Sequence, residues 1–306
     1  MMYLLLFIGF IFLIKGADYF VEGSSSIAKL LKIPSVIIGL TIVAMGTSAP
    51  EAAVSITAGL AGNSDISLSN IIGSNIFNLL VVVGICALIK PVPTDKDILN
   101  RDFLWSIALS ILLVIFLFDS KITVIEGLIL LVIFVSYLTI VIRSALKNRA
   151  MNEASLATMS PFKSIIYMIG GLCAIIMGGN LVVNNASKIA EVLGMSQTLI
   201  GLTIVAVGTS LPELVTSIVA AKKGESGLAL GNVVGSNLFN IMFILGTTTA
   251  LTPISSTITS LIDSIVLVAV SIIMYLFCRS DKKTSRMEGA ISVAIYIMYT
   301  IYIIMR

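Results

Sequence analysis

The stretch GLTIVAMGTSAPEAAVS, residues 39–55, returns almost unchanged as GLTIVAVGTSLPELVTS at residues 201–217. The match continues without a gap, and 24 of 46 positions are identical between residues 39–84 and 201–246. Because the offset between the two copies is constant, we infer that the chain is a duplicated half. Each half carries the same glutamate, Glu51 or Glu213, directly after a proline in an apolar segment.

The composition predicts that both halves lie in a membrane. Of 306 residues, 58% are hydrophobic and 11% are charged, with a mean hydropathy of +1.09, whereas soluble domains carry about 25% charged residues. Apolar windows near the ~20 residues that cross a bilayer recur along the chain. We expect ten spans, at residues 2–22, 36–58, 67–89, 103–118, 122–142, 162–183, 198–221, 228–250, 258–278 and 287–305.

Each half therefore contributes five spans, and five is an odd number. The second copy must then cross the membrane upside down relative to the first. We predict an all-α integral membrane protein with ten transmembrane helices as two inverted five-helix repeats. Its units are the first transmembrane repeat (1–142), a cytoplasmic connector (143–163) and the second, inverted repeat (164–306). Inverted repeats are typical of secondary transporters, which bind substrates near the bilayer midplane.

Lysine and arginine are distributed unevenly between the two predicted faces. The odd-numbered loops share one face and carry 15 of these residues. The even-numbered loops share the other face with both termini and carry three, Lys121, Lys188 and Arg306. Because basic residues accumulate on the cytoplasmic side, we expect a multi-pass protein of the cell membrane with extracellular N- and C-termini.

Residue types that many enzymes need are missing from the sequence. It contains no histidine, which excludes His-based zinc sites and catalytic triads. Its three cysteines, Cys86, Cys173 and Cys278, lack CxxC spacing, which argues against a zinc cluster or disulfide framework. The net charge of +3 is too small to indicate nucleic-acid binding. We expect no enzyme activity, no cofactor and no obligate protein partner.

The two glutamates lie about fifteen residues from the start of their spans. Inversion brings Glu51 and Glu213 to the same depth from opposite directions. A carboxylate at that depth costs at least ~2.5 kcal/mol, so two facing acids require a cation between them. The alternative is a protonated acid, or one that reaches toward the interface.

The adjoining prolines predict irregular backbone at the same depth. Pro50 frees the carbonyl of Gly46, and Pro212 frees that of Gly208, because proline donates no hydrogen bond and displaces that carbonyl. Irregular backbone survives within a bilayer where it is buried or lines a polar cavity. Carbonyl, hydroxyl and carboxylate oxygens together suit hard cations such as Ca²⁺ and Na⁺. A simple helix kink is the competing interpretation.

Helical spacing adds further oxygen ligands to each copy. Thr47 and Glu51 are four residues apart and share a helix face, and Ser74 and Asn78 do the same in the next span. The predicted ligands beside the glutamates are Thr47, Ser48, Ser74 and Asn78 in the first copy and Thr209, Ser210, Ser236 and Asn240 in the second. Four more residues, Ser55, Ser217, Asn75 and Asn237, are equally compatible with hydrogen bonding between helices.

These motifs carry a resemblance to a known family. GTSAPE (46–51) with GSNIFN (73–78), and GTSLPE (208–213) with GSNLFN (235–240), resemble the paired alpha repeats of Na⁺/Ca²⁺ exchangers, in the cation/Ca²⁺ antiporter superfamily. The resemblance implies that Glu51, Glu213, Thr47 and Thr209 coordinate Ca²⁺. It implies flanking Na⁺ sites at Ser48, Ser74, Ser210, Ser236 and the carbonyls of Ala44 and Ala206. The short connector indicates a compact prokaryotic-type member without the large regulatory domain of animal exchangers.

We therefore predict a Na⁺/Ca²⁺ antiporter that works by alternating access, with both ions as substrates and the lipid bilayer as its surroundings. H⁺/Ca²⁺ antiport is the nearest alternative, since carboxylates can trade Ca²⁺ for protons. K⁺-dependent Na⁺/Ca²⁺ exchange is a second alternative, but the members of this superfamily that require K⁺ place an acid at the position of Asn240. A Ca²⁺ channel is a third alternative, although channels usually form their pores by rotational symmetry about the membrane normal.

Two further predictions concern the helices that move during transport and the other charged residues within the spans. Spans one and six lack the Pro–Glu motif and are predicted to move as the gate. Asp18 and Glu22 near the end of span one are interpreted as a solvated helix end, and Asp18 aligns with Asn180, so the acid is not duplicated. Asp119, Glu126 and Asp263 are interpreted as interfacial.

Overall fold

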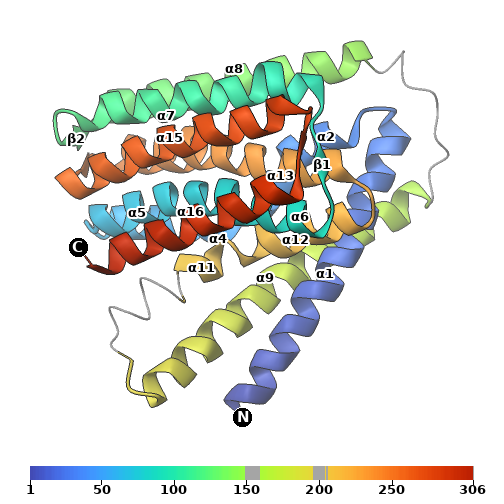
Figure 1. The fold of residues 1–306 in the computed structure, drawn as a ribbon, viewed down its shortest axis with the longest axis horizontal. Helices are drawn as coiled ribbons and strands as arrows, with labels where there is room; N and C mark the ends of the chain where they lie inside the picture. The colour runs from blue at the N-terminus through green and yellow to red at the C-terminus, as the bar shows by residue number, and fades with distance from the viewer. Residues whose placement is uncertain (149–158, 196–203, 205, 306) are drawn as a thin grey trace.

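The computed structural model describes residues 1–148, 159–195, 204 and 206–305, and these form a helical bundle (Figure 1). Among them are eight helices that are long and apolar enough to cross a membrane, and one further pair of helices bent by 49°. The predicted all-α, multi-pass membrane fold is therefore confirmed. The count of ten spans and the inverted arrangement stay predictions, because the predicted span 198–221 and the connector lie partly outside the described residues.

The helices follow the predicted windows, and π-helical turns (η) occur within several of the described spans. The first half contains α1 (Met2–Leu31), α2 (Ser35–Ile38), η1 (Gly39–Val43), α3 (Ala44–Thr47), α4 (Ala49–Leu60), α5 (Ser64–Phe77), η2 (Asn78–Val82), α6 (Val83–Ile89), η3 (Ile98–Asp102), α7 (Phe103–Leu117) and α8 (Val124–Asn148). The second half contains α9 (Pro161–Val192), α11 (Ala206–Thr209), α12 (Leu211–Lys222), α13 (Ser226–Phe239), η5 (Asn240–Leu245), α14 (Gly246–Leu251), α15 (Ile258–Ser280) and α16 (Arg286–Met305).

The spans that carry the predicted ligands lie at the centre of the bundle. In the most apolar window of the α5–η2–α6 span, 83% of residues are buried inside the protein, and in that of α13–η5–α14, 94%. The corresponding share is 22% for α8 and 11% for α16, which therefore lie at the periphery. Any polar group on the two central spans is thus enclosed by protein and must find its partners there.

Helices α1 and α9 are longer than predicted, at 30 and 32 residues. The predicted windows stop at residues 22 and 183 because hydropathy falls where polar residues begin, whereas the backbone hydrogen bonding continues. The two helices form an antiparallel pair that stands at an angle to the others (Figure 1). Glycines seven residues apart line their contact, at Gly9, Gly16 and Gly23 of α1 and at Gly171 and Gly178 of α9. Such small residues allow helix backbones to approach closely in membranes.

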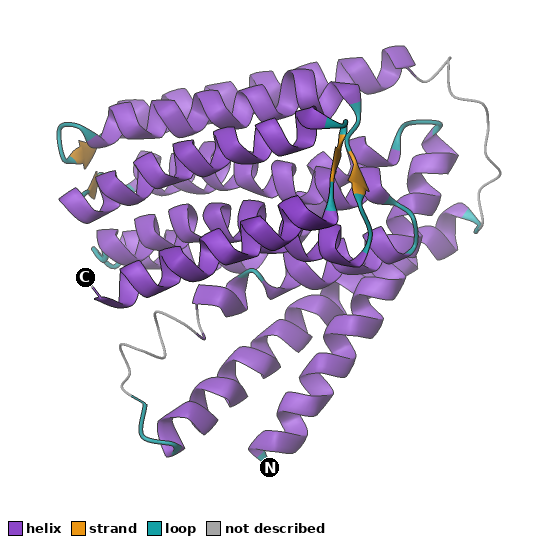
Figure 2. Ribbon diagram, in the orientation of Figure 1, coloured by secondary structure: helices purple, strands orange, loops and turns teal. Residues whose placement is uncertain are grey.

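Two short strand pairs join loops of the two halves, and they were not expected from the sequence. β1 (Val92–Pro93) pairs antiparallel with β4 (Lys283–Thr284), and β2 (Lys121–Ile122) pairs with β3 (Ile254–Ser255). The pairs lie at opposite ends of the bundle (Figure 2). β1 and β3 occupy equivalent positions of the two repeats, as do β2 and β4. Each half therefore contributes one strand to each end.

Candidate cation-binding site

Both Pro–Glu motifs occur where a span is broken at a serine. Ser48 separates α3 from α4 with φ −82° and ψ 8°, and Ser210 separates α11 from α12 with φ −90° and ψ 6°. The prolines occupy the first turn of the helix that follows. Proline is tolerated there because the first N–H groups of a helix have no intrahelical partner. The break therefore falls two residues before each proline.

The two glutamates lie in the first turns of these restarted helices. Glu51 is the third residue of α4 and Glu213 the third residue of α12, and each is only 1% exposed. The N-terminus of a helix carries a partial positive charge that stabilises a nearby carboxylate. The broken span thus provides favourable electrostatics for a negative charge that would be costly in an unbroken membrane helix.

Each carboxylate contacts the break of the opposite half. Ser48 Oγ donates a hydrogen bond of 2.8 Å to Glu213 Oε1, and Ser210 Oγ donates one of 2.9 Å to Glu51 Oε1. The residues of the two motifs, which are far apart in the sequence, therefore meet in one place. Their reciprocal contacts bring Glu51, Glu213, Ser48 and Ser210 together as the repeat predicts.

Several buried oxygens in this place have no hydrogen-bond partner among the described residues. They are Glu51 Oε2, Glu213 Oε2, Ser74 Oγ, Asn78 Oδ1 and Asn240 Oδ1. Buried polar atoms are almost always paired, because leaving one unpaired costs about 1–3 kcal/mol. Hydroxyl, amide and carboxylate oxygens of this kind are the ligands that Ca²⁺ and Na⁺ prefer. The set is therefore suited to a hard cation.

The four asparagines of the GSN motifs divide into two roles. Asn78 Nδ2 donates to Asn237 Oδ1 at 3.1 Å, and Asn240 Nδ2 donates to Asn75 Oδ1 at 2.9 Å. Asn75 and Asn237 also donate to each other's backbone carbonyls, at 3.3 and 3.1 Å. Asn75 and Asn237 thus serve as hydrogen-bond partners between helices, and their amides fix Asn78 and Asn240 with the Oδ1 atoms unpaired.

Asn78 and Asn240 are also the first residues of the π-helical turns η2 and η5. A π-helical turn shifts the register of the side chains that follow it, and such turns are frequent at functional sites. Both central spans contain this feature at the same repeat position, and the hydropathy pattern does not reveal it.

Two site residues were missed from the sequence, Asn70 and Asn232. Asn70 Oδ1 accepts from Thr209 Oγ1 at 3.3 Å, and Asn232 Oδ1 accepts from Thr47 Oγ1 at 3.0 Å. Their amide groups donate to Ser55 and Ser217 and to the backbone carbonyls of the glutamates, at 2.8–3.4 Å. They orient the predicted ligands Thr47 and Thr209. Their identity at equivalent repeat positions was the signal that could have found them.

The two halves differ at the predicted flanking positions. Ser236 Oγ lies 3.5 Å from the carbonyl oxygen of Ala44 and 3.4 Å from Glu213 Oε1, whereas Ser74 Oγ has no partner among the described residues. The Ala44 carbonyl also accepts the backbone N–H of Ser48 at 3.0 Å. Ala206 is the first residue of α11, and residue 205 before it is not among the residues that the structure describes. The site is thus not perfectly symmetric.

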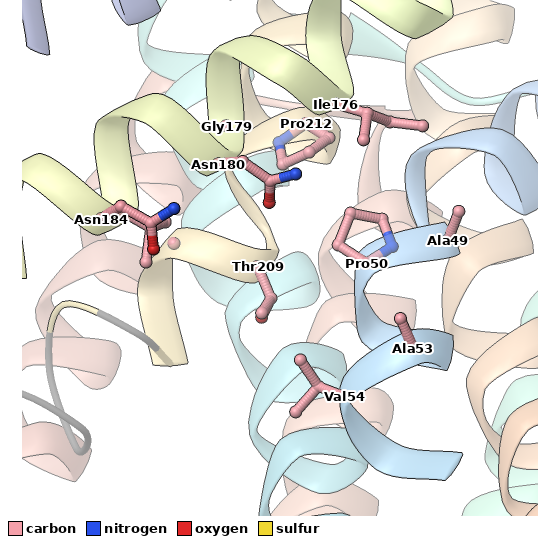
Figure 3. Close-up of a pocket in the computed structure, with 12 residues that line it drawn as sticks. Ala49, Pro50, Ala53, Val54, Ile176, Gly179, Asn180, Asn184, Thr209 and Pro212 are labelled. Carbon is pink, nitrogen blue, oxygen red and sulfur yellow. The ribbon is translucent and has the colours of Figure 1, made fainter. Parts of the chain in front are cut away.

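A cavity of ≈ 360 Å³ lies beside the site, between α9 and the broken spans (Figure 3). Pro50, Pro212 and Thr209 line it from the broken spans, and Asn180 and Asn184 line it from α9. Thr209 is 8% exposed, whereas its counterpart Thr47 is 0% exposed. The cavity therefore reaches the site from the Thr209 side. Its α9 wall leads toward the end of the α1–α9 pair that holds the N-terminus (Figure 1).

Among the described residues, the charged groups of the site are limited to the two glutamates. No group of three or more His, Cys, Asp or Glu side chains is found in that part of the chain. The site therefore combines two carboxylates with neutral oxygens. Such a mixture binds a cation while keeping the buried charge low.

Comparisons with known proteins agree with this geometry. A family model described as "Sodium/calcium exchanger protein" matches residues 1–143 and 163–305. The chain is 39% identical over 303 residues to the putative antiporter CaxA of Alkalimonas amylolytica, covering 95% of both chains. It is 34% identical to the sodium/calcium exchanger MaX1 of Methanosarcina acetivorans, covering 98% of this chain and 97% of that one. A structure of the exchanger NCX_Mj, soaked with Na⁺ and Sr²⁺, superposes with a TM-score of 0.87 at 34% identity, covering 97% and 96%.

Proposed function

This chain belongs to the sodium/calcium exchanger family, and from that membership we propose that it exchanges Na⁺ for Ca²⁺ across the membrane as a secondary active antiporter. The predicted resemblance to a compact prokaryotic-type member is confirmed by these matches. The family consists of membrane transporters rather than enzymes. The proposal adds that Na⁺ drives the movement of Ca²⁺ and assigns residues to each ion.

The observation that carries the proposal is the group of unpaired oxygens between the two halves. Glu51 and Glu213 bring two negative charges, which match the charge of one Ca²⁺. Their free Oε2 atoms, together with the Oδ1 atoms of Asn78 and Asn240, supply ligands from both central spans. We assign Ca²⁺ to these oxygens and to the hydroxyls of Thr47 and Thr209, which Asn232 and Asn70 orient.

Na⁺ is assigned to flanking positions around the same carboxylates. The serine hydroxyls at Ser48 and Ser210 contact the glutamates directly. Ser74 and Ser236, with the carbonyls of Ala44 and Ala206, would complete these positions. Because Na⁺ and Ca²⁺ would share the two carboxylates, binding of one ion disfavours the other. That competition is what an antiporter requires.

Alternating access would let this shared site open to one face at a time. The cavity beside Thr209 supports access from the face that holds the termini, which we propose to be extracellular on the strength of the uneven loop charges. Helix α9 of the α1–α9 pair lines this cavity, and the pair stands at an angle to the other helices. We propose that the pair moves against the core as the gate.

H⁺/Ca²⁺ exchange is the second candidate, because two buried carboxylates could carry protons in place of Na⁺. The test is Ca²⁺ uptake into proteoliposomes of the purified protein, preloaded either with Na⁺ or with choline under an imposed pH gradient. We expect uptake with internal Na⁺ and none with choline. Uptake that follows the pH gradient and ignores Na⁺ would replace Na⁺/Ca²⁺ exchange with H⁺/Ca²⁺ exchange. Liposomes carrying the Glu51→Gln variant control for leakage.

A further inference from the structure

The turn between α12 and α13 is attached to the gate helix α1 by charged groups outside the cation site. Lys223 Nζ donates a hydrogen bond of 2.9 Å to the backbone carbonyl of Asp18, and it lies 3.5 Å from Asp18 Oδ1 and 3.9 Å from Glu22 Oε2. Two residues later, Glu225 accepts a hydrogen bond from Ser25 Oγ. We call these five residues the α1 latch.

The local sequence explains how one turn presents both charges. Lys223 follows the last residue of α12, and Glu225 is the N-cap position of α13. Gly224 between them has φ +81°, a left-handed conformation that favours glycine. The chain therefore reverses within three residues, with Lys223 and Glu225 both beside α1.

Helix α12 connects the latch to the cation site. Glu213 lies in its first turn and Lys223 caps its far end, ten residues later. At 1.5 Å per residue the two positions are about 15 Å apart along the helix axis. A displacement of α1 against α12 therefore breaks the latch without requiring any change in the glutamate itself.

The equivalent positions of the other half carry no such latch. In the alignment of the two repeats, Asp18, Glu22 and Ser25 correspond to Asn180, Asn184 and Ser187 of α9. Asn180 and Asn184 face the cavity (Figure 3), and Ser187 Oγ is buried without a partner among the described residues. The residues that correspond to Lys223 and Glu225 are Ala61 and Asn63, which are uncharged.

We propose that Lys223 is a positioning residue for transport, and that the α1 latch holds the face opposite the termini closed. The latch is one-sided, so it favours the state in which the cavity beside Thr209 is open. Opening the other face requires α1 to leave Lys223 and Glu225. The inference rests on the proposed alternating access but not on which ions are exchanged.

The exposure of the three charged side chains agrees with a contact that breaks in every cycle. Lys223, Asp18 and Glu22 are 34%, 37% and 46% exposed. Exposed ion pairs are weak, so the latch biases the two states without locking one of them. Its loss should change their ratio by up to about fivefold, since an exposed pair is worth up to ~1 kcal/mol.

Cysteine accessibility tests this without any transport measurement. In a background with Cys86, Cys173 and Cys278 replaced by Ser, Ala53→Cys reports on the open cavity, since Ala53 lines it. Thr216→Cys reports on the other face, because Thr216 is 0% exposed here and corresponds to Val54 of the cavity wall. We expect Lys223→Gln to raise the rate of labelling at Thr216→Cys by an impermeant maleimide about two- to fivefold relative to Ala53→Cys.

Matched variants separate the latch from a general effect of charge. Lys222→Gln removes the neighbouring exposed lysine, for which no ion pair is found in the described part of the chain, and should leave the labelling ratio unchanged. Lys223→Arg should keep the wild-type ratio. Asp18→Asn should add little to Lys223→Gln, since both remove the same contact. An unchanged ratio in Lys223→Gln, or an equal change in Lys222→Gln, would overturn the proposal. A protein that labels as expected but fails to exchange Na⁺ for Ca²⁺ would contradict the proposed function alone.

Discussion

Ser48 Oγ lies 2.8 Å from Glu213 Oε1, although 165 residues separate the two in the chain. The equivalent contact of the other half, from Ser210 to Glu51, is 2.9 Å long. Each serine also forms the break that starts the helix of its own glutamate. Each serine thus breaks the span of its own half and donates a hydrogen bond to the glutamate of the other half, so neither half can form the site alone.

Replacing either serine should weaken Na⁺ binding first. In Ser48→Ala or Ser210→Ala a carboxylate loses its shortest hydroxyl contact, and a hydrogen bond to a charged group is worth about 1.5–3 kcal/mol. We expect the Na⁺ concentration for half-maximal exchange to rise roughly tenfold or more, with less effect on Ca²⁺. Ser271→Ala is the control, because Ser271 is equally buried on α15 but outside the site. Equal behaviour of all three variants would contradict a role for the serines in Na⁺ binding.

The glutamates should be indispensable for exchange but not for folding. Two carboxylates neutralise one Ca²⁺, so Glu51→Gln or Glu213→Gln leaves a net positive charge in a buried place, which is expensive. We expect Na⁺-driven Ca²⁺ uptake to be lost. Thermal unfolding of the ion-free protein should be unchanged or shifted upward, because a buried acid is removed, whereas stabilisation by added Ca²⁺ should disappear.

Glu126→Gln provides the matched control for these variants. Glu126 lies in the first turn of α8, where it accepts the backbone N–H of Thr123 at 2.7 Å. It belongs to neither broken span. The variant should retain exchange and stabilisation by Ca²⁺. Near-normal uptake by Glu51→Gln or by Glu213→Gln would contradict a shared site.

The sequence predicted best which residues lie together where the repeat and the chemistry coincide. Glu51, Glu213 and their serines are identical in both halves and are unusual in an apolar span, so the pattern alone indicated that they meet. Asn70 and Asn232 are identical as well, yet one asparagine in a helix is also typical of ordinary helix contacts. Only the hydrogen bonds to Thr209 and Thr47 reveal their role.

Other features could not be predicted because they depend on contacts between distant residues. The spacing of Asp18 and Glu22 predicts a solvated helix end, because it describes only their own helix. The structure places Lys223, from the other half of the chain, beside them. The π-helical turns at Asn78 and Asn240 add one residue to a turn, and hydropathy does not register this change. The strand pairs are two residues long and leave no periodic pattern.

The missed asparagines lead to a third prediction. Asn232 is 0% exposed and contacts Thr47, Ser217 and the backbone of Glu213. In Asn232→Ala each of these groups loses one hydrogen bond, although Thr47 and Ser217 keep backbone acceptors, and each lost bond should cost about 0.5–1.5 kcal/mol. We expect Ca²⁺ affinity, measured by calorimetry, to fall roughly tenfold or more. Asn70→Ala should act in the same direction through Thr209. Unchanged affinity in both variants would show that the asparagines only pack the helices.

The gate assignment predicts that a cross-link can stop transport without stopping binding. Joining α1 to the core through Asp18→Cys and Lys223→Cys with a reducible thiol cross-linker would fix a contact that must otherwise break. We expect Na⁺-driven Ca²⁺ uptake to stop and to return on reduction, while Ca²⁺ still raises the unfolding temperature. The cross-linking reagent applied to each single variant controls for modification alone. Full turnover in the cross-linked protein would contradict the movement of α1.

The last prediction concerns K⁺ and rests on Asn240. Asn240 Nδ2 is held by Asn75 Oδ1 at 2.9 Å, and its neutral Oδ1 leaves the site with two carboxylates rather than three. A third carboxylate would need another monovalent cation or a proton, because an unpaired buried charge is expensive. We therefore expect Na⁺-driven Ca²⁺ uptake to persist when choline replaces K⁺ on both sides of the membrane.

Asn240→Asp should make uptake dependent on K⁺ or on low pH, and Asn75→Ala serves as the control that disturbs the amide without adding charge. A strict K⁺ requirement in the unaltered protein would show that two carboxylates are not the whole charge of the site.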